Sequence, residues 1–182
     1  MLGFAILLYW YRRKSGVGGP TRVQPVVSGG SGVFASYKQR DDNDALVMNM
    51  FYSLKPLDVW LDKMRGEERS EAGMVAGVKA CQLFCAVISP AYFKSDFCLL
   101  EIRTALQQKK RIAVCFNGSK YTVQEALAWI PTEFEPLKND ELIKLDEDME
   151  YMVIGLDKLK QRLKQRRRTA EGSPWQGSKA RS

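Results

Sequence analysis

The sequence predicts one α/β domain built on a parallel sheet, and three observations indicate this class. Short apolar runs rich in strand formers alternate with longer segments whose apolar residues recur at helical spacing. The run "LFCAVIS" (83–89) is almost wholly apolar, which is typical of a strand covered on both faces. The chain of 182 residues has room for one core of ordinary size. Alternating strands and helices are joined by right-handed crossovers, so helices on both faces of a parallel sheet are expected.

The first half of the domain alternates twice between strand and helix. "VFASY" (33–37) predicts a strand, and apolar residues at helical spacing predict a helix within 41–55. "LDVWL" (57–61) predicts the second strand. The polar segment 62–73 is too long for a tight turn, and a short helix is expected over 74–81.

The second half repeats the alternation. After the central strand, a helix is expected over 96–110, a strand over 111–116, a weak helix over 122–130 and a short strand over 141–145. The last helix, 146–165, is acidic at its start and basic at its end, as the helix dipole favours. Five such units make a flavodoxin-like domain, a five-stranded parallel sheet with helices on both faces, whose function gathers at the carboxyl ends of the strands.

The net charge of +7 comes from the ends of the chain. Residues 31–159 hold 16 basic and 20 acidic residues, a net of −4, whereas 160–182 hold eight basic residues and one acidic residue. We therefore expect a folded domain over 32–165 and a disordered basic tail over 166–182. Nucleic acid is not an expected partner, and a tail that contacts phosphates or an anionic membrane is the alternative.

The N-terminal segment 1–14 has an apolar run followed by three basic residues. The run is shorter than the roughly 20 residues of a membrane span, but its order is that of the cytosolic edge of one. The truncated end of a span, an interfacial anchor and an upstream coding artefact all stay open. Each places the rest of the chain in the cytoplasm, with membrane association through 1–14 in the first two. Residues 15–31 form a glycine- and proline-rich linker.

The composition excludes much chemistry, because the chain has no histidine. A histidine-containing triad, a histidine general base and histidine-ligated zinc are therefore absent. Four cysteines in apolar settings form no CxxC pair, so we expect reduced, buried thiols and predict neither a metal site nor a bound cofactor.

Glu101 is the candidate catalytic residue, and helix geometry places it at the border of an apolar stripe. At 100° per residue it lies about 40° from Ala105, on the flank of the stripe centred on Cys98 and Ile102. A carboxylate there is partly desolvated. Helix geometry alone favours a plain edge glutamate that pairs with Lys94 or another cation.

Four segments in order resemble the TIR domain, the Toll/interleukin receptor homology module, over residues 32–163. "VFASYKQRDD" resembles its first strand, and "DVWLDKMRGEERSEAGMVAGVKAC" resembles its second strand, long BB loop and second helix. "LFCAVISPAYFKSDFCLLEI" resembles its central strand, Ser–Pro–x–Tyr turn and Ser–x–Trp–Cys–x–x–Glu helix start, and "KKRIAVCF" resembles its fourth strand. Phe97 stands where the enzymes of plants and bacteria usually have tryptophan.

The resemblance implies one of two functions. Some TIR proteins cleave NAD+ at the nicotinamide–ribose bond in immune or cell-death signalling, giving nicotinamide and linear or cyclic ADP-ribose. Their catalytic glutamate matches Glu101, and NAD+ is a substrate that needs no cofactor. The alternative is a non-catalytic adaptor or receptor tail, for which the N-terminal segment and the 62–73 loop argue. In both cases the family implies self-association through TIR–TIR contacts, and other TIR proteins as possible partners.

Further residues are expected at the substrate site on the same resemblance. Phe34 and Tyr37 would line the pocket, Lys38 would meet phosphate, and Ser95 would place the ribose in addition to capping its helix. The full set expected to bind NAD+ is Phe34, Tyr37, Lys38, Trp60, Asp62, Ser95 and Phe97. Each has a structural alternative: a core aromatic, a solvated lysine, a loop or helix cap. Cys98 is expected to pack in the core.

A phospho-receiver of the same fold class is not supported. A receiver needs a phosphorylatable aspartate at the end of its third strand, and this strand ends in Ser89–Pro90.

Overall fold

The computed structural model describes residues 32–55, 57–64 and 70–164. The predicted N-terminal segment 1–14, the linker 15–31 and the tail 166–182 lie outside the described residues. The strands are β1 (Val33–Tyr37), β2 (Val59–Trp60), β3 (Leu83–Ile88), β4 (Arg111–Asn117) and β5 (Ile143–Leu145). The α-helices are α2 (Asp44–Ser53), α3 (Glu71–Ala80), α4 (Asp96–Gln107), α5 (Val123–Trp129) and α6 (Met149–Lys164). The 3₁₀ helices are η1 (Asp62–Met64), η3 (Tyr92–Lys94) and η4 (Thr132–Asn139).

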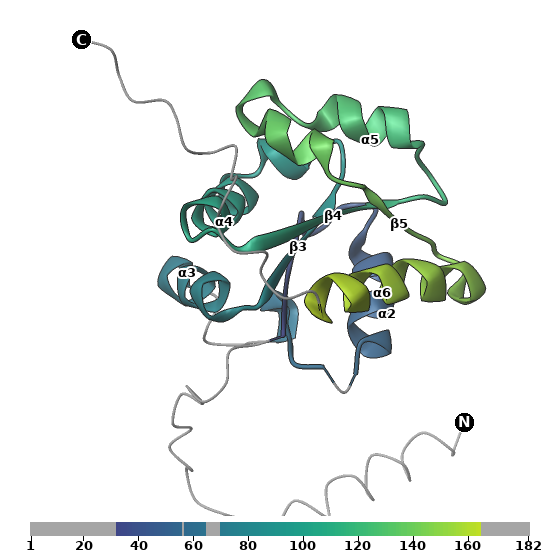
Figure 1. The fold of residues 1–182 in the computed structure, drawn as a ribbon, viewed down its shortest axis with the longest axis horizontal. Coiled ribbons are helices and arrows are strands. Elements are labelled where there is room, and N and C mark those ends of the chain that lie inside the picture. The colour runs from purple at the N-terminus through teal and green to yellow at the C-terminus, as the bar shows by residue number, and fades with distance from the viewer. Residues whose placement is uncertain (1–31, 56, 65–69, 165–182) are drawn as a thin grey trace, which may run out of the picture.

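The five strands form one parallel sheet in the order β2-β1-β3-β4-β5, which confirms the predicted fold class (Figure 1). Val33 of β1 pairs with Val59 of β2 on one side and with Leu83 of β3 on the other. β1 and β3 therefore lie inside the sheet, and all six residues of β3 are buried, as its apolar run predicts. Since every strand runs the same way, the carboxyl ends of all five meet at one edge.

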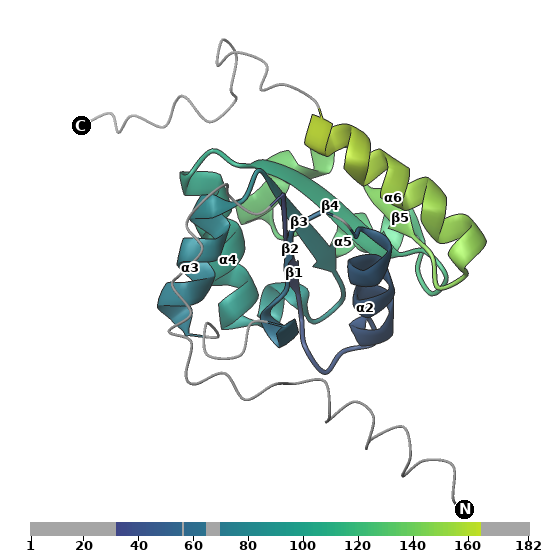
Figure 2. The same ribbon diagram turned by 90° about the horizontal axis from the view of Figure 1, so that it is seen from below.

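Helices cover both faces of the sheet, α2 and α6 on one and α3 and α4 on the other (Figure 2). Each face has its own hydrophobic core because successive strand residues point to opposite faces. Ala35 and Cys85 pack in the core under α2 and α6, whereas Phe34 and Phe84 pack in the core under α3 and α4. Among the described residues, no helix is long and apolar enough to cross a membrane.

The bounds of some elements differ from those predicted from the sequence, and the differences lie next to polar or irregular segments. β2 is only two residues long, and α3 begins at Glu71, three residues earlier than predicted. The Ser70 hydroxyl accepts a hydrogen bond from the Gly73 amide at 3.1 Å, so this cap moves the helix start back. η4 was not expected, because Pro136 and the surrounding charged residues give no periodic pattern.

Gly155 is the position where α6 approaches the sheet most closely, and we expect Gly155→Ala to destabilise the protein. A Cβ there would lie 2.4 Å from the Lys144 carbonyl oxygen and 2.9 Å from Leu145 Cδ2, so backbone would have to move. We expect a loss of about 2 kcal/mol in the free energy of unfolding, measured by urea titration, although alanine is the better helix former. Gly32→Ala is the control, because its Cβ would make only ordinary contacts of 3.4 and 3.7 Å. A Gly155→Ala protein as stable as the wild type would contradict the packing.

Candidate active site

Glu101 lies in the second turn of α4, and it is only 7% exposed to solvent. The buried face of α4 includes Thr104, which lies about 60° beyond Glu101 on the helical wheel, on the side away from Cys98, while Leu106 is only partly buried. The buried stripe therefore extends past Glu101, and α3 packs beside α4 on the same face of the sheet (Figure 2). Glu101 is a buried carboxylate and not the border residue that periodicity predicts.

A pocket of about 310 Å³ opens beside Glu101 at the carboxyl edge of β1 and β2. Its walls come from the segment after β1, from η1, from α3 and from the first turns of α4. The lining residues are Tyr37, Lys38, Gln39, Arg40, Asp62, Met74, Ser95, Phe97, Cys98 and Glu101. A buried carboxylate is thus combined with two cations and an exposed aromatic ring in one concave site.

Burial dominates the electrostatics of Glu101. Desolvation raises the pKa of its carboxyl from 4.5 to about 8, because the charged form loses its hydration. A hydrogen bond from Ser36 lowers this pKa, and the negative charge of Asp62 raises it. The Glu101 carboxyl therefore gains or loses its proton at a pH of about 8 and not near 4.5, a property typical of functional carboxyls.

A side chain of the sheet, the hydroxyl of Ser36, holds the Glu101 carboxylate by a hydrogen bond. Ser36 Oγ donates to Glu101 Oε2 at 2.6 Å, and the same Ser36 oxygen lies 2.7 Å from the Tyr92 hydroxyl. Ser36 comes from β1, Tyr92 from η3 and Glu101 from α4, so the contact joins three elements. The pattern of alternation puts Ser36 on the α4 face, two residues after Phe34.

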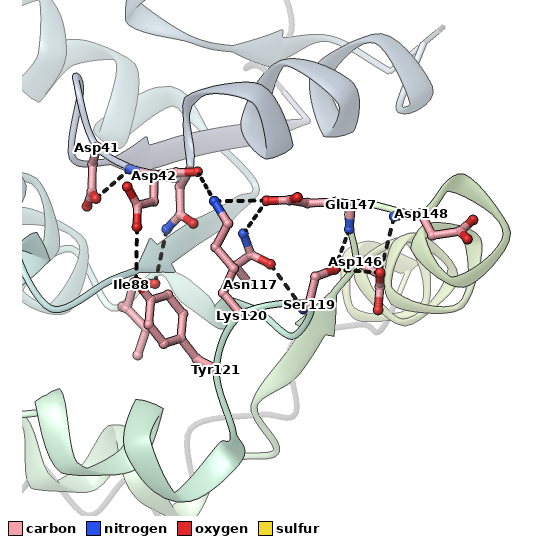
Figure 3. A network of polar contacts seen from close by, with 11 residues as sticks. Asp41, Asp42, Ile88, Asn117, Ser119, Lys120, Tyr121, Asp146, Glu147 and Asp148 are labelled. Atoms are coloured by element: carbon pink, nitrogen blue, oxygen red, sulfur yellow. Dashed lines mark hydrogen bonds and ion pairs between the residues drawn. The ribbon is translucent and has the colours of Figure 1, made fainter.

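The segment after β1, which supplies Lys38 and Arg40, is anchored from outside the pocket. The Ser89 hydroxyl donates to Asp41 Oδ2. The Tyr121 hydroxyl donates to Asp42 Oδ2 at 3.2 Å, and Lys120 Nζ donates to the Asp42 carbonyl at 3.2 Å (Figure 3). These contacts join the carboxyl ends of β1, β3 and β4. The pocket wall is therefore braced by neighbouring loops, as a preorganised site requires.

The same network continues to β5 (Figure 3). Lys120 forms an ion pair with Glu147 at 3.1 Å, and the Asn117 amide donates to the same carboxylate at 2.9 Å. Ser119 Oγ donates to Asp146 at 2.6 Å. The network is acidic, but among the described residues no group of histidine, cysteine, aspartate and glutamate side chains is arranged to hold a metal ion.

Comparison with known families decides the identity of the fold. The family model of the TIR domain matches residues 33–145, more than half of the chain. The chain belongs to the TIR domain family. This confirms the resemblance carried by the four sequence segments.

Two solved TIR structures are similar to this TIR domain. The TIR domains of the activated Roq1 resistosome, which directly recognises the pathogen effector XopQ, align with a TM-score of 0.53 at 15% identity and cover 72% of this chain and 98% of their own. The TIR domain of the Toll-related receptor TRR-2 from Hydra magnipapillata aligns with a TM-score of 0.52 at 14% identity and covers 74% and 99%. At these identities the likeness shows the fold alone. No curated protein sequence matches the chain.

Six of the predicted site residues of the TIR domain line the pocket: Tyr37, Lys38, Asp62, Ser95, Phe97 and Glu101. Their roles toward NAD+ stay predictions. Ser95 occupies the N-cap position of α4, but its side chain makes no capping hydrogen bond. Phe97 is 59% exposed, an unusual position for so large an apolar side chain.

Phe34 and Trp60 lie in the core and not in the pocket lining, which corrects their predicted placement. They are partners in the β1–β2 register and stack with ring centroids 4.2 Å apart. Phe34 lies three residues before Tyr37, the last residue of β1, so it is too far back along the strand to reach the carboxyl edge of the sheet. Gly77 of α3 covers the stack, since a Cβ there would lie 2.9 Å from Trp60 Nε1.

Sequence reasoning missed Gln39, Arg40 and Met74 in the lining. It also missed the contact of Ser36 with Glu101 and the contact of Tyr92 with Ser36. Strand alternation was a usable signal for Ser36. The Tyr92 contact joins residues 56 positions apart and has no local signature. Cys98 lines the pocket but is buried, and desolvation raises the pKa of its thiol to about 12, so it stays protonated at neutral pH.

Proposed function

We propose that this TIR domain cleaves NAD+ at the bond between nicotinamide and ribose. The observation that carries the proposal is the buried Glu101 carboxylate at the wall of a 310 Å³ pocket at the carboxyl edge of the sheet. Small-molecule sites of this fold class occupy that edge. The volume is at the small end of ligand pockets, which suits the nicotinamide ribose half of the substrate.

The charges and shape of the pocket fit the two ends of that substrate. NAD+ carries a positive pyridinium ring and a negative diphosphate. In the proposed complex the pyridinium and its ribose lie next to Glu101, and the diphosphate lies toward Lys38 and Arg40. The exposed ring of Phe97 offers a flat apolar surface on which a heteroaromatic ring stacks.

The reaction needs one carboxylate and no histidine. Nicotinamide leaves as a neutral pyridine that takes the electrons of the glycosidic bond, so no general acid is required. Positive charge then develops at the ribose as an oxocarbenium-like centre, as in glycoside cleavage. The ionised Glu101 carboxylate stabilises this charge in a site from which water is largely excluded. Water attack gives ADP-ribose, and attack by an adenine nitrogen gives a cyclic product.

The pKa of Glu101 is compatible with this role because the substrate is a cation. A positive ring beside the carboxyl favours its ionised form, so binding of NAD+ lowers the pKa from about 8. The free site is largely protonated at neutral pH, and the bound site is ionised when the bond breaks.

We expect the purified full chain to release nicotinamide from NAD+, with one ADP-ribose, linear or cyclic, for each nicotinamide. Chromatography of the reaction measures both products. Because self-association is part of the proposal, the rate should rise faster than linearly with protein concentration. No nicotinamide release across the concentration series, at pH 7 and at pH 8.5, would exclude the hydrolase.

Assembly without catalysis is the second candidate, and α6 supplies the observation for it. Four large apolar side chains are about half exposed on this helix: Met149, Tyr151, Val153 and Ile154. Such side chains on one helix are typical of a contact surface for another protein. Retention of other TIR domains in a pull-down, together with no nicotinamide release, would favour this role in receptor or immune signalling.

A further inference from the structure

Three buried groups stand in a row behind the candidate site. The Tyr92 hydroxyl, Ser36 Oγ and Glu101 Oε2 are joined by contacts of 2.7 and 2.6 Å. Tyr92 is fully buried, Ser36 is 1% exposed and Glu101 is 7% exposed. Only the glutamate belongs to the pocket lining. The two hydroxyls therefore act on any ligand through Glu101.

The count of hydrogens fixes the direction of this row. An ionised carboxylate has no hydrogen to donate, so Ser36 donates to Glu101, and Tyr92 must then donate to Ser36. When Glu101 is protonated, the row can reverse, with the carboxyl donating to Ser36 and Ser36 donating to Tyr92. All three groups remain hydrogen-bonded in both states, so neither state leaves a buried polar group unpaired.

We propose that Ser36 and Tyr92 are positioning residues for Glu101, a hydroxyl chain that holds Oε2 in place, stabilises the ionised carboxylate and leaves Oε1 to the substrate. The inference rests on the proposed NAD+ cleavage for its catalytic meaning. Among the described residues, no hydrogen bond reaches Oε1, while Oε2 accepts one from Ser36 of β1. Hydrogen bonds in a chain polarise one another, so Tyr92 strengthens the bond that Ser36 makes.

The packing of Tyr92 supports a role for its hydroxyl. Its ring lies against Phe93 with centroids 5.0 Å apart and belongs to the core under α3 and α4. A phenylalanine would bury the same apolar surface without burying an oxygen. Burial of a hydroxyl is unfavourable unless it is hydrogen-bonded, and its partner in the described part of the chain is Ser36.

The surroundings of Glu101 contain other groups that influence its charge. Asp62 of η1 disfavours the ionised form, and Cys98 shares α4 with Glu101. Lys38 and Arg40 after β1 face the same pocket. The Ser36 hydrogen bond is the largest contribution that lowers the pKa of Glu101, so loss of the Ser36 hydroxyl should raise that pKa further.

The test compares Ser36→Ala and Tyr92→Phe with the wild-type full chain. Carboxyl ¹³C NMR of glutamate-labelled protein titrates Glu101 without substrate, with the resonance assigned from its absence in Glu101→Gln. We expect Ser36→Ala to raise the pKa by about 1 pH unit, a tenfold loss of ionised carboxylate at neutral pH. Tyr92→Phe should shift it the same way by less, because Ser36 can still donate.

The pH profile of NAD+ cleavage supplies the catalytic readout. The acid limb of kcat/KM reports the free enzyme, so it should move to higher pH in step with the NMR titration. Tyr52→Phe is the matched control: it removes the hydroxyl of an exposed tyrosine on α2, outside the pocket, and should leave both readouts at wild-type values.

The outcomes separate the inference from the proposed function. An unchanged Glu101 titration and an unchanged acid limb in folded Ser36→Ala would overturn the inference even if NAD+ is cleaved. A shifted titration in a protein that cleaves no NAD+ would support the hydroxyl chain and overturn the hydrolase. If Ser36→Ala does not fold, Tyr92→Phe decides, because it keeps the ring and removes only the oxygen.

Discussion

Glu101→Gln is expected to lower the rate of nicotinamide release at least about a hundredfold, the usual effect of removing one preorganised electrostatic group from a catalytic site. Glutamine keeps the shape of the side chain and an oxygen for the Ser36 hydroxyl, which donates to Glu101 in the wild type at 2.6 Å. It removes the negative charge that would face the developing positive charge on ribose. Initial rates at pH 8.5, where the wild-type carboxylate is ionised, measure the loss.

The matched control for this substitution is Glu133→Gln. Glu133 is exposed, and its carboxylate pairs with Arg103 at 2.8 Å. Arg103 lies on α4, the helix that also carries Glu101. Its loss removes a carboxylate that contacts α4 but does not line the pocket. We expect wild-type rates from this protein. Retention of more than a tenth of the wild-type rate by folded Glu101→Gln would show that the carboxylate is not the catalytic group.

The same Glu101→Gln substitution is expected to stabilise the protein at alkaline pH. Burial, with a smaller contribution from Asp62, raises the pKa of Glu101 from 4.5 to about 8 in the folded state. Between these values the folded protein holds a proton that the unfolded chain releases, so stability falls as pH rises from 4.5 to about 8. At about 1.4 kcal/mol per pKa unit, full ionisation costs the fold about 5 kcal/mol.

Urea titrations at pH 5 and pH 9 test this prediction. The variant and the wild type should have similar free energies of unfolding at pH 5, apart from the packing of the amide, and the variant should be more stable at pH 9. The change between the two pH values cancels the packing contribution. Parallel pH dependence of the two proteins would mean that Glu101 is not buried as described. Greater stability of the variant at pH 9 would mean that the fold holds the ionised Glu101 carboxylate at a cost in stability, a common property of active sites.

Strong local patterns made most of the fold predictable. The apolar run of β3 and the strand formers of β1 predict their elements because parallel strands are buried on both faces. The length of β2 was overestimated, since only two residues of the stretch 57–61 pair in the sheet. α3 was placed late because its first turn is polar and its start depends on the Ser70 cap.

In the candidate site, the sequence alone predicted the position of Glu101 along its helix, because helix spacing is sufficient to place a single residue. The position of Glu101 on α4 follows from spacing, but its burial depends on other elements, among them Ser36 of β1, which no pattern within α4 reports. Phe34 and Trp60 are partners in the β1–β2 register and stack in the core, and a pairing between two strands has no local signature in the sequence. The contact of Ser36 with Glu101 joins residues 65 positions apart, beyond the reach of periodicity.

The four native cysteines can report local opening of the domain, because each becomes reactive only when it is exposed. All four are buried free thiols, and burial raises the pKa of Cys81 to about 11 and that of Cys98 to about 12. A thiol that is both covered and protonated does not react with alkylating reagents. Cys85 and Cys115 lie in the core under α2 and α6, whereas Cys81 and Cys98 lie under α3 and α4. Alkylation followed by mass spectrometry would therefore time the exposure of each side of the sheet separately, without any introduced label.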